Sequence, residues 1–151
     1  MFSRVLFPTD GSDVSLSAAD AAITMAKLGG APLQPVYVVE PYPFTGIGVA
    51  RPAGFDDYMA ASRRAAAIGF ERIERLAGAQ GVRCEPLTVE HSRAAEGIVE
   101  TAQSIGADLI VMGSHGRSGV AKLVLGSVAT KVLQLSPIPV LVVKSGEASA
   151  A

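Results

Sequence analysis

Short apolar runs alternate with longer segments of helical periodicity along the whole chain. The run RVLFPTD at residues 4–10 is mostly apolar as far as Pro8 and is followed by Gly11, which is typical of a buried strand. Similar runs predict four further strands, at residues 33–40, 82–90, 108–113 and 137–143. Between these runs, apolar positions recur at the spacing of an amphipathic helix, which predicts helices at residues 14–30, 55–81, 93–105 and 127–135.

This alternation predicts a single α/β domain built on an open, doubly wound, five-stranded parallel sheet. Right-handed crossovers between parallel strands place the helices on both faces of such a sheet. Ligands bind beyond the carboxyl ends of the strands, at the point where the strand order reverses. We therefore expect functional residues at positions 8–12, at 38–41 and from 112 onward.

Composition and charge exclude several classes of protein. The chain has 151 residues, of which 49% are apolar; we expect one domain at residues 1–144 and a disordered tail at 145–151. A formal net charge of −1 provides no global basic field for nucleic acid or an anionic membrane. No apolar run approaches the roughly 20 residues of a membrane span. Cys84 is the only cysteine, so no intrachain disulfide can form. We expect a cytoplasmic protein without nucleic-acid or membrane partners.

Glycine is concentrated where the fourth predicted strand passes into the last helix. Residues 113–127 read GSHGRSGVAKLVLGS, and glycine at position 113 lets the chain turn at positive φ and lets backbone amides approach a ligand closely. The first N–H groups of a helix lack internal partners and attract anions, and Ser127 stands where that helix begins. The loop is neither a Walker P-loop nor a dinucleotide fingerprint. From the residues alone, a phosphate cradle and a tight structural turn with a helix cap are equally favoured.

The spacing Gly113-x2-Gly116-x9-Gly126-Ser127 matches a known signature, G-2x-G-9x-G-(S/T). With the opening VLFPTDGS, the block ADLIVMGSHGRSG and the ending PIPVLVV, the chain resembles the ATP-binding branch of the universal stress protein family from Ser3 to Val143. The resemblance implies the strand order 3-2-1-4-5. It also implies a homodimer that pairs the predicted edge strand, residues 138–143, with its copy.

The resemblance implies a site for ATP or another adenine nucleotide, with Mg²⁺ beside the phosphates. In this layout Asp10 accepts hydrogen bonds from the ribose or the adenine edge, and Val38 flanks the base. Met112 and Gly113 border the ribose and the α-phosphate, and the residues from Gly116 onward surround the phosphates. The complete set of expected contacts is Pro8, Thr9, Asp10, Ser12, Val38, Met112, Gly113, Gly116, Arg117, Gly126, Ser127 and Val128.

The chain departs from its relatives at two places. Ser92 and Ala94 replace a Gly-x-Pro pair at the start of the third predicted helix, so the ligand contact of some relatives is not carried over to this position. Ala129 replaces a hydroxyl residue of some relatives, which removes one phosphate donor.

Three other residues, two histidines and one cysteine, have side chains that could take part in chemistry. His115 is more simply a loop histidine with local hydrogen bonds, and His91 is expected at the surface. Cys84 is expected as a small core residue, and these residues are too far apart in sequence to suggest a metal site.

Three functional hypotheses remain open. A nucleotide-binding stress-response module is favoured, with ATP or cyclic AMP as its ligand and slow ATP hydrolysis left undecided. An interaction protein of the same fold that uses no nucleotide is the second. A hydrolase or phosphotransferase that uses Asp10 is the third, although the sequence names no oriented catalytic base.

Overall fold

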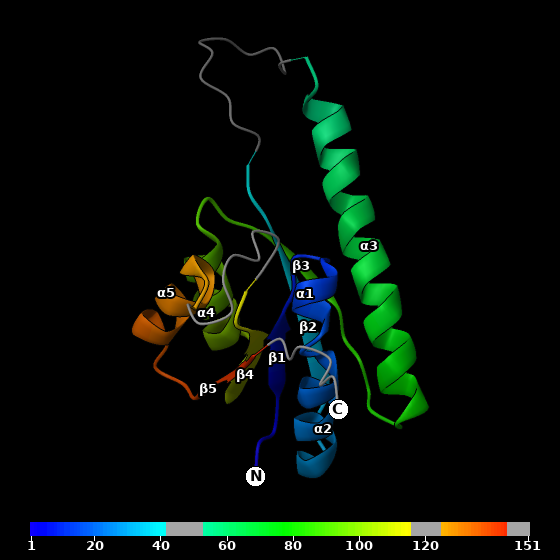
Figure 1. Ribbon diagram of the computed structural model, residues 1–151, viewed down its shortest axis with the longest axis vertical. Coiled ribbons are helices and arrows are strands. Elements are labelled where there is room, and N and C mark those ends of the chain that lie inside the picture. The colour runs from blue at the N-terminus through cyan, green and yellow to red at the C-terminus, as the bar shows by residue number, and fades with distance from the viewer. Residues whose placement is uncertain (42–52, 116–124, 145–151) are drawn as a thin grey trace, which may run out of the picture.

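A five-stranded parallel sheet lies at the centre of the computed structural model, which describes residues 1–41, 53–115 and 125–144 (Figure 1). Every neighbouring pair of strands is parallel, and the order is β3-β2-β1-β4-β5. The predicted sheet and strand order are therefore confirmed. The strands are β1 Val5–Pro8, β2 Leu33–Val39, β3 Leu87–Glu90, β4 Leu109–Gly113 and β5 Val140–Val143.

Helices cover both faces of this sheet. In the described residues, α2 and α3 lie on one face, and α4 and α5 lie on the other (Figure 1). The helices are α1 Asp13–Leu16, α2 Ala19–Gly29, α3 Phe55–Ala79, α4 Ala94–Ser104 and α5 Ser127–Leu135.

The strands are apolar throughout because each of their two faces is buried. Along β1, Val5 and Phe7 pack in the cluster beneath α2 and α3, whereas Leu6 packs in the cluster beneath α4 and α5. All three side chains are completely buried. A strand covered on both sides shows a continuous apolar run in place of alternation, as the sequence of β1 does.

The first predicted helix, expected as one unit over residues 14–30, is divided into α1 and α2. At the division, the amide of Ala18 donates to the carbonyl of Ser15 at 3.2 Å, a tighter turn than an α-helix makes. The hydroxyl of Ser15 also bonds the carbonyl of Ser12, and the hydroxyl of Ser17 bonds that of Val14. Such local bonds compete with the regular helical ladder, which explains the break.

Two strands begin later than predicted, and proline accounts for both. Pro86 directly precedes β3, and only an isolated bridge between Leu33 and Cys84 pairs residues earlier in this segment. Pro139 likewise directly precedes β5 and contributes only its carbonyl, which accepts from Ile110 at 3.0 Å. Proline has no N–H to donate, so it limits ladder pairing at the strand start.

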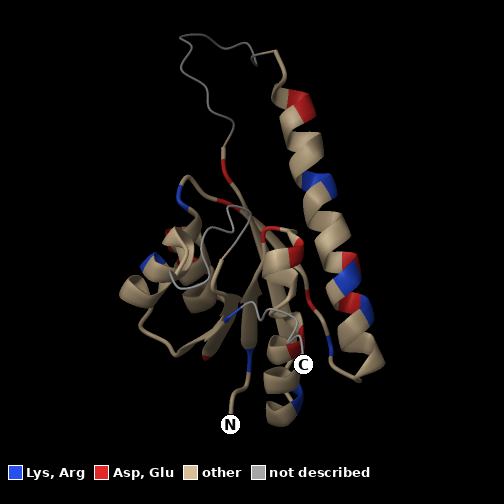
Figure 2. Ribbon diagram, viewed as in Figure 1, with Lys and Arg blue, Asp and Glu red and all other residues tan. Residues whose placement is uncertain are grey.

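Helix α3 extends beyond the carboxyl ends of the strands (Figure 1). Acidic and basic residues follow one another along it (Figure 2), and Glu71 pairs with Arg75 at 3.5 Å as the i,i+4 spacing predicts. Arg72 also reaches Asp13 of α1, with the nitrogen and oxygen 2.9 Å apart. In the described part of the chain, no helix combines the length and the apolar character needed to cross a membrane.

Candidate functional site

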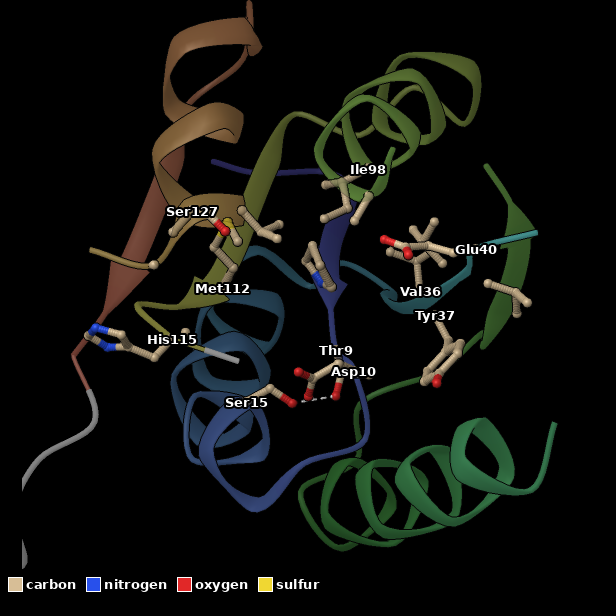
Figure 3. Close-up of a pocket in the computed structure, with 18 of the residues that line it drawn as sticks. Thr9, Asp10, Ser15, Val36, Tyr37, Glu40, Ile98, Met112, His115 and Ser127 are labelled. Atoms are coloured by element: carbon tan, nitrogen blue, oxygen red, sulfur yellow. Dashed lines mark hydrogen bonds between the residues drawn. The ribbon is translucent and has the colours of Figure 1, made fainter. Parts of the chain in front are cut away.

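A pocket of about 440 Å³ opens at the carboxyl ends of β1, β2 and β4 (Figure 3). We call it the carboxyl-end pocket; helices α1, α3, α4 and α5 also contribute to its walls. Its volume falls in the range of small-molecule sites. Among the residues predicted from the sequence, those that line it are Pro8, Thr9, Asp10, Val38, Met112, Gly113, Gly126, Ser127 and Val128.

The turn after β1 is held by a network of short side chains. The hydroxyls of Thr9 and Ser15 lie 2.8 Å apart, and both residues are buried. The carboxylate of Asp10 accepts from the amide of Ser12 at 2.9 Å and from the Ser12 hydroxyl. Ser12 also caps α1 and, although it was predicted as a contact, does not line the pocket. Its role is to orient the Asp10 carboxylate through these two hydrogen bonds. Asp10 is thereby held at the pocket wall as an acceptor (Figure 3).

Helix α3 approaches this turn closely because glycine occupies two facing positions. Gly11 has φ +79°, and a Cβ there would lie 2.9 Å from the carbonyl oxygen of Ala65. A Cβ on Gly69 would lie 3.3 Å from the Cα of Gly11. This contact places Tyr58 and Ser62 of α3 in the pocket wall. Neither residue was predicted from the sequence, because nothing in the helical pattern indicates which turn of α3 packs beside β1.

The two described glycines of the predicted cradle differ in their structural role. Gly113 is the last residue of β4 and has no positive φ, so the conformational freedom of glycine is not used there. A Cβ on Gly113 would meet nothing closer than 3.5 Å. Gly126 has φ −61° and ψ 159°, and its amide donates to the carbonyl of Ser114 at 2.7 Å. A Cβ on Gly126 would lie 2.9 Å from that oxygen, so close packing requires glycine there.

The first turn of α5 faces the carboxyl-end pocket. Gly126 is its N-cap and offers no side chain to cap the helix. The amide of Thr130 makes the first intrahelical bond, to Gly126, so the N–H groups of Ser127, Val128 and Ala129 have no acceptor within the helix. Unpartnered N–H groups and the positive end of a helix dipole are the features that suit the binding of an anion.

Charge is distributed unevenly along the pocket. Asp10 and Glu40 line it at the ends of β1 and β2, whereas α5 presents its N-terminus at the other end. The described lining residues include no Lys or Arg. The two predicted contacts Gly116 and Arg117, and the neighbouring Lys122, lie outside the described residues.

His115 and His91 both make local contacts. His115 Nδ1 lies 3.0 Å from the Ser114 hydroxyl, and Figure 3 shows the ring directed away from Thr9 and Asp10. His91 is more buried than predicted, with its side chain 23% exposed. Its Nδ1 accepts from the amide of Arg93 at 2.9 Å, and its Nε2 lies 3.3 Å from a carboxylate oxygen of Glu100.

Cys84 is a half-buried residue at the margin of the core, in line with its predicted role. Burial raises the pKa of its thiol from 9.0 to about 11, and the carboxylates of Glu74 and Glu85 add to this shift. Within the described ranges, no three His, Cys, Asp or Glu side chains are grouped to hold a metal ion.

Comparison with known proteins agrees with this architecture. The sequence profile of the universal stress protein family matches residues 1–144. A universal stress protein of Methanocaldococcus jannaschii is 37% identical over 144 residues, which span 95% of this chain and 83% of that protein.

Two solved structures extend the comparison. A universal stress protein family member from Burkholderia pseudomallei is 30% identical, with a TM-score of 0.75 over 95% of this chain and 96% of the other. A universal stress protein solved in complex with cyclic AMP is 28% identical, with a TM-score of 0.67 over 96% of this chain and 98% of the other. The chain therefore belongs to the universal stress protein family.

Proposed function

We propose that the carboxyl-end pocket binds an adenine nucleotide, with ATP as the principal ligand, and that the protein acts as a nucleotide-responsive regulatory module in a stress response. One observation carries this proposal: the N-terminus of α5 and the oriented carboxylate of Asp10 line the same pocket at the reversal of strand order. The N-terminus of α5 is suited to bind phosphate, and the Asp10 carboxylate is suited to accept hydrogen bonds from sugar hydroxyls.

The distribution of donors and acceptors sets the direction of the nucleotide. Its phosphates lie against the free N–H groups at the start of α5, away from Asp10 and Glu40. Its ribose lies beside Asp10, because a carboxylate accepts hydrogen bonds from hydroxyls. The base lies at the end of β2, where Val38 and Ile98 line an apolar part of the pocket.

Mg²⁺ accompanies ATP in this proposal. The ion commonly binds through phosphate oxygens, water and one or two carboxylates, without a dedicated protein cage. The lining carboxylates Asp10 and Glu40 lie away from the phosphate end, and the described residues form no separate metal cluster, so phosphate oxygens and water would hold the ion. This donor set fits an ion carried by the nucleotide. Gly116 and Arg117 remain predicted phosphate contacts.

The relative solved with cyclic AMP makes that nucleotide the second candidate ligand. Isothermal titration with ATP and Mg²⁺, followed by competition with cyclic AMP, separates the two. We expect ATP to bind with one site per chain and to be displaced only weakly by cyclic AMP. Tighter binding of cyclic AMP would transfer the assignment to it, and binding of neither would refute the proposed site.

We also propose a homodimer formed through β5 and its neighbouring residues, 138–143. β5 is an edge strand in the observed order, and Leu141 on it is 39% exposed. An exposed apolar edge strand presents unpaired backbone groups that a second copy satisfies.

A further inference from the structure

We propose that Glu40 selects the base of the bound nucleotide. It would favour bases with an amino group at the position of the adenine 6-amino group over bases with an oxo group there. This inference rests on the proposed nucleotide function and adds to it a residue that discriminates between bases.

Glu40 is placed at the base end of the pocket by the chain itself. It directly follows β2, and its side chain lines the carboxyl-end pocket. Figure 3 shows its carboxylate directed into the pocket from the end of that strand. β2 and β4 lie on either side of β1, two strand spacings or about 10 Å apart. Glu40 is therefore separated from the α5 end by roughly the length over which a nucleotide extends from phosphate to base.

The backbone that carries Glu40 is tied to α3. The hydroxyl of Tyr58 donates to the carbonyl oxygen of Glu40 at 2.9 Å. Tyr58 lies in the first turn of α3, and the same helix packs against Gly11 at the end of β1. Tyr58 is thus a positioning residue: it holds the carboxyl end of β2, and with it the Glu40 side chain, relative to the rest of the pocket.

The Glu40 carboxylate distinguishes amino bases from oxo bases by its hydrogen-bonding character. A carboxylate only accepts hydrogen bonds, so it pairs with an exocyclic amino group. A 6-oxo base presents an acceptor at the same position, and the two oxygens repel each other. Glu40 is exposed, so solvent reduces both effects. We expect the protein to bind the amino base about tenfold more tightly than the oxo base. This figure corresponds to the low end of the free energy that a hydrogen bond to a charged group contributes.

Inosine triphosphate tests this choice, because its base carries an oxo group where adenine carries the amino group. Dissociation constants for ATP and inosine triphosphate, each with Mg²⁺, are measured for the native protein, Glu40→Gln and Glu90→Gln. The amide of glutamine both donates and accepts, so Glu40→Gln should bring the two affinities within about twofold of each other. Glu90 ends the neighbouring strand β3 outside the lining of the pocket, and its variant should keep the native preference.

The outcomes separate the inference from the function on which it rests. If ATP binds and Glu40→Gln keeps the native preference, Glu40 does not read the base, while the nucleotide function stands. Equal affinity of the native protein for both nucleotides leads to the same conclusion. If neither nucleotide binds the native protein, the nucleotide function and the role of Glu40 both fall. Melting temperatures of the variants close to the native value confirm that the pocket is folded.

Discussion

Replacing Ser127 with proline tests the phosphate site at the level of one backbone group. Ser127 is the first residue of α5, and proline is favoured at that position because the missing N–H has no partner within the helix. Proline also restricts the preceding residue to extended conformations, and Gly126 already has ψ 159°. The substitution therefore removes one donor from the pocket while leaving the helix intact.

The expected loss follows from the hydrogen bond that disappears. A bond from a backbone amide to a charged acceptor contributes about 1.5–3 kcal/mol, and each 1.4 kcal/mol is about tenfold in affinity. Ser127 is exposed, so the low end of this range applies. We expect Ser127→Pro to weaken ATP binding about tenfold and to leave the free energy of unfolding within about 0.5 kcal/mol of the native value, as for a surface substitution.

Isothermal titration with ATP and Mg²⁺ measures the affinity, and urea unfolding measures the stability. Ser127→Ala is the matched control, because alanine keeps the amide and removes only the hydroxyl. The alanine variant should retain most of the affinity. Native affinity in Ser127→Pro would refute backbone recognition by α5, and an equal loss in both variants would assign the contact to the hydroxyl instead.

Three further predictions concern the fold, the thiol and the oligomer. Gly126→Ala should lower the free energy of unfolding by about 1–3 kcal/mol in urea titrations, because its Cβ would lie 2.9 Å from a backbone oxygen. Gly113→Ala should change stability much less, since 3.5 Å of clearance is ordinary contact; an equal loss in both variants would contradict the packing argument. Cys84 has its pKa raised from 9.0 to about 11, so the protonated thiol is favoured in the folded state. The stabilisation that comes from this pKa shift is therefore full below pH 9 and is lost as the pH rises from 9 to 11. Alkylation of the Cys84 thiol at pH 8 should be slow in the folded protein and fast in urea. Rapid alkylation of the folded protein at pH 8 would contradict the assigned environment. Leu141→Lys on the edge strand should shift sedimentation toward the monomer, whereas Ile68→Lys, at a 67% exposed site on α3, should leave the dimer unchanged. A dimer that survives Leu141→Lys would place the interface elsewhere.

The strands themselves and the start of α5 could be predicted because local sequence signals agree with the fold there, whereas the spatial order of the strands came from the family resemblance. The apolar run from Leu109 ends at glycine, and the last helix begins at Ser127, as expected. Where side-chain hydrogen bonds override the apolar pattern, prediction failed. The break between α1 and α2 coincides with bonds from the hydroxyls of Ser15 and Ser17 to backbone carbonyls. The spacing of apolar residues does not reveal those bonds.

Part of the candidate site could be predicted from the sequence, namely the residues at the ends of strands, whereas the part that depends on helix packing could not. The residues at strand ends, such as Asp10 and Met112, follow from the rule that ligands bind at the carboxyl edge. The contribution of Tyr58 depends on how far α3 extends over that edge, which is set by its close contact with Gly11. Gly113 does not use the positive φ that glycine permits, because β4 continues through this residue.

Mass spectrometry under native conditions, repeated after denaturation, tests the central claim most directly. We expect the native protein, alone or after addition of ATP with Mg²⁺, to carry one adenine nucleotide per chain and to release it on denaturation. Ser127→Pro should carry markedly less under the same conditions. A native protein that retains no nucleotide, and whose melting temperature does not rise with added ATP and Mg²⁺, would contradict nucleotide binding in the carboxyl-end pocket.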